Sequence, residues 1–498
     1  MPINPQYSEI NFIKSAGEKK ESVQVSCRLD VPTESVLKVI SLSVAAHAVP
    51  DGSGEEPKLS GKAIFCLCYE DAEGSLKKYE CKKDFFVSFD ITAEQKLTDV
   101  HVKAEKTEYD TSGVNLSVSA LLSVFASVTE KVSANYLSGG EGIIVNGTER
   151  EITKNYGAVF GAFPVTEEFE LPYPIKAVLT HKAEMSVTSV QCGVGSVIID
   201  GEVIITALVL SNAENGAIIK ECKNIPVRID AEYEDAMPVF RPTASAFVKS
   251  FKTDVTVDET NGKSTVEVSL SVGYEVSAFS SDNILIATDA FSKTENVSLE
   301  YGEIEFIKPC GERFEREKQT VKVALGTLSA SDEVICLYND SAEVVSFKAE
   351  GDALEVAIAY TADAIIKGEN GYRTERIMSP AIVKLNEFNS LGELSVSALA
   401  FESDFKKVSG DELEISFIVA LHICGKERAT EKYVKSVRAD GEKQTENSGF
   451  SVYIALSGED LWSLSKRLNV CPDELTEGNK ELKFPLSGDE RIVVYRKR

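Results

Sequence analysis

The 498-residue chain lacks the short motifs that mark common enzyme classes. It has no Walker A loop, no GxGxxG fingerprint, no HExxH helix and no GxSxG turn. Gly193-Val194-Gly195 is a lone fragment, which a turn between strands explains better than a phosphate-binding loop. The abundant carboxylates leave one alternative open, a glycosidase pair hidden among them. We expect a protein that is not an enzyme, with no catalytic, cofactor-binding or metal-binding residues.

Positive charge and long apolar runs are also scarce. The chain has 53 Lys and Arg against 79 Asp and Glu, a formal net charge of −26. Non-specific binding to nucleic acid or to anionic lipid needs basic patches, so we expect no nucleic-acid partner and no direct membrane insertion. No run approaches the roughly 18 apolar residues of a membrane span, and residues 1–20 lack the profile of a signal peptide. These absences predict a cytoplasmic protein.

The ten cysteines show no C-x-x-C spacing of the kind found in zinc and redox sites. Most of them lie in apolar strand patterns, which favours buried reduced thiols of the kind typical of the cytoplasm. Cys66 and Cys68 are two residues apart, so they share one face of a predicted strand. His422 is in register with Glu412 and Glu414 on the non-core face of its strand, where we expect a solvated imidazole.

What the chain does contain is one β-rich pattern that occurs three times. The segments 61–69, 201–209 and 353–360 match in apolar character and in their place in the pattern. In the first two copies a polar turn leads into a second strand that reaches Cys81 or Cys222, which predicts a hairpin. The third copy keeps the polar turn and lacks the cysteine.

Each copy also begins and ends with a similar strand. The opening strands are predicted at 36–44, 175–185 and 334–345, and the closing strands, which alternate apolar and polar residues, at 116–128, 265–276 and 413–423. Each copy spans about 110 to 140 residues, which exceeds any solenoid period. Each copy should therefore be a domain with its own core. Polar segments between the copies, at 137–142, 301–318 and 438–447, indicate linkers or inter-domain hairpins.

The last fifty residues carry a different pattern, which predicts a strand, two helices and a strand. An apolar strand at 452–456 is followed by a turn that ends at Asp460, a residue suited to capping a helix. Leu461, Leu464 and Leu468 then recur at the spacing of one buried helical face. A second helix should run from Pro472 to about 478, and a closing strand should cover 492–495.

In order and spacing this pattern resembles the LysM domain, through Gly458-Glu459-Asp460-Leu461, Val470, Leu475, Asn479 and Gly488. The chain departs from that family by ending in Tyr495-Arg496-Lys497-Arg498 where a proline-bearing strand is usual. The resemblance implies that a glycan or a protein partner binds the loops 457–461 and 479–482. The residues it assigns to that site are Ile454, Ser457, Gly458, Glu459, Asp460, Leu461, Trp462, Asn479, Lys480 and Leu482.

Three β-rich units followed by such a module resemble the SPOCS-domain proteins of spore-forming Firmicutes, and in arrangement the SipL-like spore-coat assembly proteins. The fold expected is mainly β, with three repeated SPOCS-like domains and a small α+β unit of βααβ order. The expected divisions are an N-terminal extension (1–22), repeats at 23–135, 150–300 and 318–437, a linker (438–449) and the LysM domain (450–498).

The resemblance implies a non-catalytic scaffold of spore morphogenesis in the mother cell, at the forespore surface or in the spore coat. Its LysM would bind the coat-assembly ATPase and help to localise the coat around the forespore. The alternative is that the LysM binds peptidoglycan or another N-acetylglucosamine-containing glycan of the spore cortex or wall. Trp462, the only tryptophan, should lie at the edge of the helical core face and partly in solvent, where it either contacts the partner or extends the small core. We expect Ile454 to be its companion.

Overall fold

The chain folds almost entirely into strands. The computed structural model describes residues 2–50, 58–212, 216–258, 260–326, 328–329, 331–369, 371–388, 392–444 and 449–495. Within these ranges lie twenty β-strands, two short α-helices and one turn of 3-10 helix. The prediction of a mainly β protein is confirmed.

The first eighteen strands form six three-stranded antiparallel sheets, two in each unit. The first unit consists of β1 (Asn4–Pro32), the 3-10 turn η1 (Thr33–Ser35), β2 (Val36–Pro50), β3 (Lys58–Asp71), β4 (Leu76–Ser88), β5 (Gln95–Asp110) and β6 (Asn115–Glu141). Its two sheets have the orders β1-β6-β5 and β2-β3-β4. The middle strands β3 and β6 contain the segments 61–69 and 116–128, whose patterns predicted strands.

The same strand order recurs in the next two units. The second unit comprises β7 (Ile144–Leu171), β8 (Ile175–Cys192), β9 (Ser196–Ser211), β10 (Ile218–Glu232), β11 (Arg241–Asp258) and β12 (Lys263–Phe291). The third comprises β13 (Glu295–Ala324), β14 (Glu333–Glu350), β15 (Ala353–Gly368), β16 (Gly371–Leu385), β17 (Glu393–Ser409) and β18 (Glu412–Glu442). Their sheets have the orders β7-β12-β11 with β8-β9-β10, and β13-β18-β17 with β14-β15-β16.

Each unit is a β-sandwich with its own apolar core between two sheets. The alternation of β6 places Leu116, Val118, Leu122 and Val124 on the inner face, where they pack with Phe65 of β3. Equivalent cores surround Val272 in the second unit and Phe417 in the third. Alternating strand sequences therefore account for the three cores.

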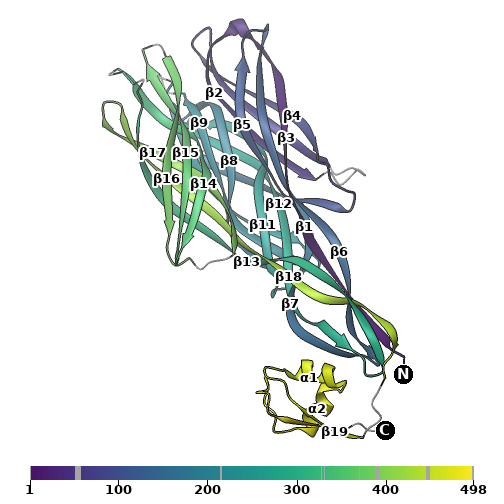
Figure 1. Ribbon diagram of the computed structural model, residues 1–498. Coiled ribbons are helices and arrows are strands. Elements are labelled where there is room, and N and C mark those ends of the chain that lie inside the picture. Colours follow the sequence, from purple (N-terminus) through teal and green to yellow (C-terminus); the bar gives the residue numbers. More distant parts are fainter. Residues whose placement is uncertain are drawn as a thin grey trace.

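Two further sets of buried residues join the units to one another. The central cluster draws on all three units and consists of Ile40, Cys68, Leu179, Leu208, Leu210, Ile218, Cys336, Tyr338 and Ile365. The stem is formed where β1, β6, β7, β12, β13 and β18 extend beyond the sandwiches toward the end of the molecule that carries the N-terminus (Figure 1). Its buried residues are Ile10, Phe12, Ala134, Leu137, Ile143, Ile152, Ile286, Ala287, Ala290, Ile304, Phe306, Tyr433, Val434 and Val437.

The stem differs from the divisions expected from sequence. Residues 4–22, expected in an N-terminal extension, belong to β1 and pair with β6 from Glu141 onward. Segment 301–318, expected as a linker, lies within β13, and the expected linker at 438–449 is paired with β13 as far as Glu442. Residues 445–448 of that linker lie outside the described part of the chain. These segments look polar because one face of each strand meets solvent, which hides their pairing.

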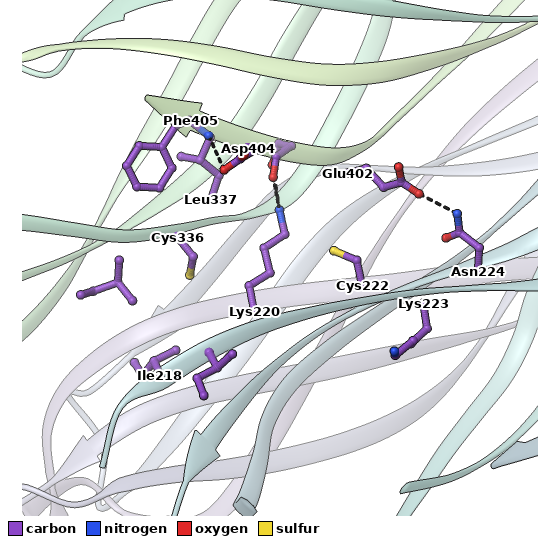
Figure 2. A pocket seen from close by; sticks show the side chains of 13 residues that line it. Ile218, Lys220, Cys222, Lys223, Asn224, Cys336, Leu337, Glu402, Asp404 and Phe405 are labelled. Atoms are coloured by element: carbon purple, nitrogen blue, oxygen red, sulfur yellow. Dashed lines mark hydrogen bonds between the residues drawn. The ribbon is translucent and has the colours of Figure 1, made fainter. Parts of the chain in front are cut away.

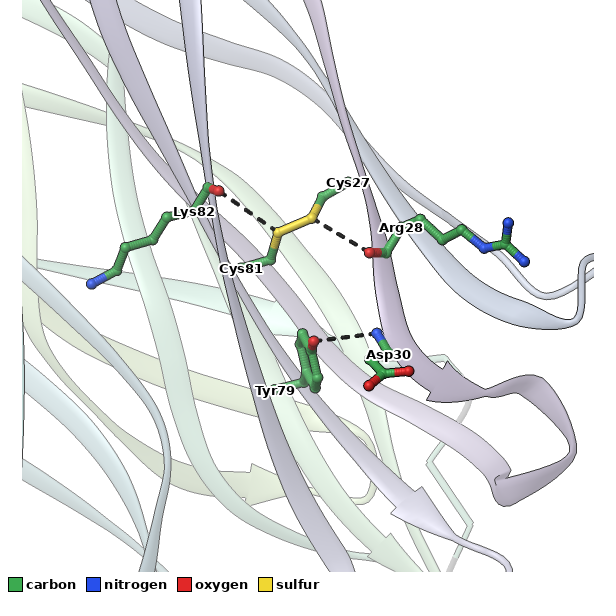
Figure 3. The surroundings of a disulfide bond; sticks show 6 residues. All are labelled: Cys27, Arg28, Asp30, Tyr79, Cys81 and Lys82. Atoms are coloured by element: carbon green, nitrogen blue, oxygen red, sulfur yellow. Dashed lines mark hydrogen bonds between the residues drawn. A yellow bond between two sulfur atoms is a disulfide. The ribbon is translucent and has the colours of Figure 1, made fainter.

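One pair of cysteines departs from the expectation of reduced thiols. Cys27 of β1 and Cys81 of β4 form a disulfide that links the two sheets of the first sandwich (Figure 3). Both strands are outer strands of their sheets, and this edge-to-edge proximity is not visible in a spacing of 54 residues. The other eight cysteines are free.

Neither of the α-helices in the described residues has the length and apolar character needed to cross a lipid bilayer.

Candidate functional site

The C-terminal unit, residues 449–495, is a two-stranded sheet with two helices. β19 (Phe450–Ile454) pairs antiparallel with β20 (Arg491–Tyr495), and α1 (Leu461–Leu468) and α2 (Pro472–Gly478) lie where the sequence predicts them. Its core is separate from those of the sandwiches and consists of Ala455, Leu464, Leu468, Val470, Leu475, Leu486, Ile492 and Val494, with Leu461 and Leu482 partly buried against it. The side chain of Asp460 caps α1 by accepting a hydrogen bond of 2.7 Å from the Ser463 N–H.

Two of the predicted binding residues are committed to bonds within the unit. Glu459 forms a bidentate ion pair with Arg467, with oxygen–nitrogen distances of 2.6 and 2.7 Å, and these bonds lower the pKa of its carboxyl. The Asn479 amide donates 2.8 Å bonds to the carbonyls of Leu475 and Val493, and its oxygen accepts a 2.7 Å bond from the Val493 N–H. Asn479 therefore joins the end of α2 to β20 and has little capacity left for a ligand.

The first predicted loop, 457–461, is bonded through its backbone to Leu486, which lies beyond the second predicted loop. The Gly458 N–H donates to the Leu486 carbonyl at 2.7 Å, and the Leu486 N–H donates back to the Glu459 carbonyl at 2.9 Å. Among the predicted site residues in these loops, Ser457, Gly458, Asp460 and Lys480 are exposed, and Asp460 already caps α1. The structure thus brings the first loop to the segment around residue 486, and leaves only a few polar groups free for a ligand.

Trp462 is half-buried against the stem. Its indole N–H donates a 2.8 Å hydrogen bond to Asp289 near the end of β12, and its ring meets that of Phe291 edge-on at 5.2 Å between centroids. Lys466, one turn along α1, donates 2.7 Å bonds to both oxygens of Asp289. Burial opposes ionisation of Asp289, but the bonds from Lys466 and Trp462 hold the pKa of its carboxyl below the usual range.

We call the three sandwiches with their stem the body. The other contacts between the C-terminal unit and the body are polar. Asn469 donates a 2.7 Å bond to the carbonyl of Lys293, and Lys293 is paired with Glu474 at 2.6 Å. Lys443 donates to the carbonyl of Ser292 at 2.7 Å and to the amide oxygen of Asn469 at 3.1 Å. We call this set of contacts, together with Asp289, Phe291, Trp462 and Lys466, the stem contact.

The outer side of the C-terminal unit carries an apolar strip. The side chains of β19 alternate between the two faces of the strand, so that every second side chain points away from the small core. The strip consists of Phe450, Val452, Ile454, Leu456 and Tyr495, which are between 51% and 69% exposed. Five large apolar side chains at this exposure on one small unit form a patch of the kind that marks an interaction surface.

A hollow of about 690 Å³ lies between β10, β14 and β17, where the second and third units meet (Figure 2). Lys220 reaches across it and donates to the carbonyl and hydroxyl of Ser403 at 2.7 and 2.9 Å. Its ammonium is also 3.6 Å from Asp340, which accepts a 2.7 Å bond from the Tyr360 hydroxyl. These buried polar groups satisfy one another and hold two units together.

The thiols in this hollow are poor nucleophiles. Cys222 and Cys336 line it, and burial raises the pKa of both, that of Cys336 to about 12. A reactive cysteine needs the opposite shift. We therefore regard the hollow as part of the interface between units.

Sequence reasoning anticipated the helices of the C-terminal unit but not its neighbours. Ile454 is the predicted neighbour of Trp462. In the structure, Asp289 and Phe291 contact the Trp462 side chain instead. Asp289 is one of 79 acidic residues, and nothing in its neighbourhood marks it in advance. The exposed strip could have been found from the sequence. Tyr453 and Ala455 lie on one face of the strand, and Phe450, Val452 and Ile454 make the opposite face apolar as well.

The chain matches no family model, no curated protein and no solved structure.

Proposed function

We propose that the chain is a non-catalytic scaffold of spore morphogenesis that binds a coat-assembly ATPase through its C-terminal unit and helps to localise the coat around the forespore. In this proposal the three sandwiches are SPOCS-like repeats and the C-terminal unit is a LysM domain. The proposal starts from the sequence resemblance. Its site differs from the expected one, because the predicted loops are largely committed to bonds within the unit.

The observation that carries the proposal is the apolar strip of Phe450, Val452, Ile454, Leu456 and Tyr495. A protein partner can bury such a strip and gain roughly 25 cal/mol for each Å² of apolar surface removed from water. A glycan instead requires several convergent polar groups, and Glu459 and Asn479 already bond within the unit. The strip therefore favours protein binding over the alternative, peptidoglycan binding.

The test is a pull-down with the purified full chain, a purified coat-assembly ATPase and insoluble peptidoglycan in parallel. The wild-type chain should retain the ATPase, and Ile454→Asp should lose most of that binding because it places a charge in the centre of the strip. Lys480→Ala, which removes an exposed side chain from the second predicted loop, is the matched control and should bind normally. Retention on peptidoglycan that Lys480→Ala abolishes and Ile454→Asp does not would overturn the proposal in favour of glycan binding.

Trp462 provides a second arm of the same experiment. Because its indole contacts Asp289 in the full chain, Trp462→Glu should release the C-terminal unit from the stem. If the strip alone binds the partner, Trp462→Glu retains binding. If the partner also displaces Asp289 and takes up the indole, the substitution abolishes binding while the unit stays folded.

A further inference from the structure

Three metal-ligating side chains converge on the third unit, outside every contact described so far. They are Glu312 of β13 and His422 and Cys424 of β18, the one such grouping among the residues that the structure describes. The Cys424 sulfur lies 3.1 Å from the His422 Nε2 atom and 3.5 Å from the Glu312 Oε1 atom. The His422 Nε2 and Glu312 Oε1 atoms are also 3.5 Å apart.

The strand ladder explains why these side chains meet. Glu312 and Cys424 are direct partners across the antiparallel pair of β13 and β18, and His422 lies two residues before Cys424, on the same face of the sheet. Phe314 is the ladder partner of His422, and its ring stacks on the imidazole at 4.5 Å between centroids. The three groups are therefore held by regular β-structure.

The distances match one face of a metal tetrahedron. Zinc bonds of about 2.3 Å to sulfur and 2.0–2.2 Å to nitrogen and oxygen place neighbouring ligand atoms about 3.3–3.6 Å apart. The observed separations of 3.1, 3.5 and 3.5 Å are close to these edges. An ion could enter with small side-chain adjustments, because His422 is 28% and Glu312 10% exposed.

The same geometry does not suit a thiol catalyst. In a Cys-His-acid triad, the thiol and the carboxylate bond to opposite nitrogens of the imidazole. Here both lie against Nε2, so they converge on one point. Burial also raises the pKa of the Cys424 thiol, whereas an activated nucleophile needs a lowered one.

We propose that Glu312, His422 and Cys424 bind a single zinc-class divalent ion, with water as the fourth ligand. The thiolate and imidazole select a borderline or soft transition metal over Mg²⁺ and Ca²⁺, which prefer oxygen ligands. A bound ion would connect β13 to β18 in the sandwich of the third unit. Metal binding would thus stabilise this unit, because the folded chain holds the site and the unfolded chain does not.

The experiment adds Co²⁺ and then Zn²⁺ to the full-length chain, with its Cys27–Cys81 disulfide intact, in excess Mg²⁺, which occupies surface sites made only of carboxylates. One equivalent of Co²⁺ should produce a thiolate-to-cobalt charge-transfer band and the strong visible bands of four-coordinate cobalt, and Zn²⁺ should remove both. Cys424→Ser should abolish the charge-transfer band, and Glu312→Gln should weaken Zn²⁺ binding by at least about tenfold. Cys192→Ser removes a free thiol in another unit and should bind as the wild type does.

Two results would overturn the proposal. One is the absence of a charge-transfer band in the wild-type chain at one equivalent of Co²⁺. The other is a band that persists in Cys424→Ser. Melting temperatures of the metal-free variants, measured alongside, show whether a lost band reflects a lost ligand or a lost fold.

Discussion

The three sandwiches and the C-terminal unit are attached to the rest of the molecule in different ways. The sandwiches share the stem and the central cluster, in which buried apolar residues come from all three units. The C-terminal unit has a complete core of its own and meets the body through the largely polar stem contact. Repeats that look independent in sequence are thus joined through shared cores, whereas the terminal module remains separable.

The largest expected effect comes from truncating one core side chain in the body and one in the C-terminal unit. Phe306 is buried in the stem and Leu464 is buried in the C-terminal unit. Truncation to alanine should cost about 3–5 kcal/mol at Phe306 and about 2–5 kcal/mol at Leu464, through lost burial and a cavity. Phe306→Ala should lower the main unfolding transition of the body, and Leu464→Ala should affect only the C-terminal unit, as followed by calorimetry. A fall in the main transition in both variants would show that the two parts share one cooperative unit.

The disulfide offers the next largest effect, confined to the body. Cys27 and Cys81 close a loop of 54 residues, so replacing both with serine should cost about 2–4 kcal/mol through the greater freedom of the unfolded chain. The double variant should melt lower in the main transition, with no change in the C-terminal unit. The wild-type chain in reducing agent should behave like the variant. Equal stability of the oxidised and reduced chains would contradict this prediction.

A buried carboxyl between the first two units should make the stability of the body depend on pH. Glu275 of β12 accepts hydrogen bonds from the N–H groups of Asp99 at 2.7 Å and Val100 at 3.4 Å, and burial raises its pKa from 4.5 to about 7. Because the folded pKa lies above the unfolded one, its stabilisation is complete below pH 4.5 and is lost as the pH rises through 7.

We expect Glu275→Gln to remove this dependence. The difference in unfolding free energy between wild type and variant should change by up to about 3 kcal/mol from pH 4.5 to pH 8, in favour of the variant at high pH. Denaturant titrations at both pH values measure it. Glu267→Gln, at an exposed position on the same strand, is the control and should leave the pH profile unchanged.

The smallest effect concerns the stem contact itself. Asp289→Ala removes the acceptor of the Trp462 indole and the partner of Lys466, which should free the C-terminal unit without unfolding either part. Because Trp462 is the only tryptophan, its fluorescence should shift to longer wavelength as the ring enters water. Asp282→Ala is the control. It removes the ion pair between Asp282, also on β12, and Lys154 of β7, and should leave the emission unchanged. An unshifted spectrum in Asp289→Ala would show that the contact does not position Trp462.

The sequence predicted those parts of the fold whose patterns are local. Strands such as β6 alternate apolar and polar residues because one face is buried, and α1 begins at the residue after its cap, Asp460. The middle of β1, residues 16–22, is exposed throughout and shows no such alternation, so its pairing with β6 could not be seen. The disulfide and the stem contact depend on residues far apart in the chain, and no local pattern identifies such partners.

Calorimetry of the full chain beside the isolated fragment 450–498 tests the separability of the C-terminal unit most directly. The full chain should show two transitions. The smaller one should match the transition of the fragment to within the modest stabilisation supplied by the stem contact. It should disappear when residues 450–498 are deleted, while the larger transition stays in place. A single transition in the full chain, together with a fragment that shows no cooperative unfolding, would contradict the conclusion that the C-terminal unit folds separately from the body.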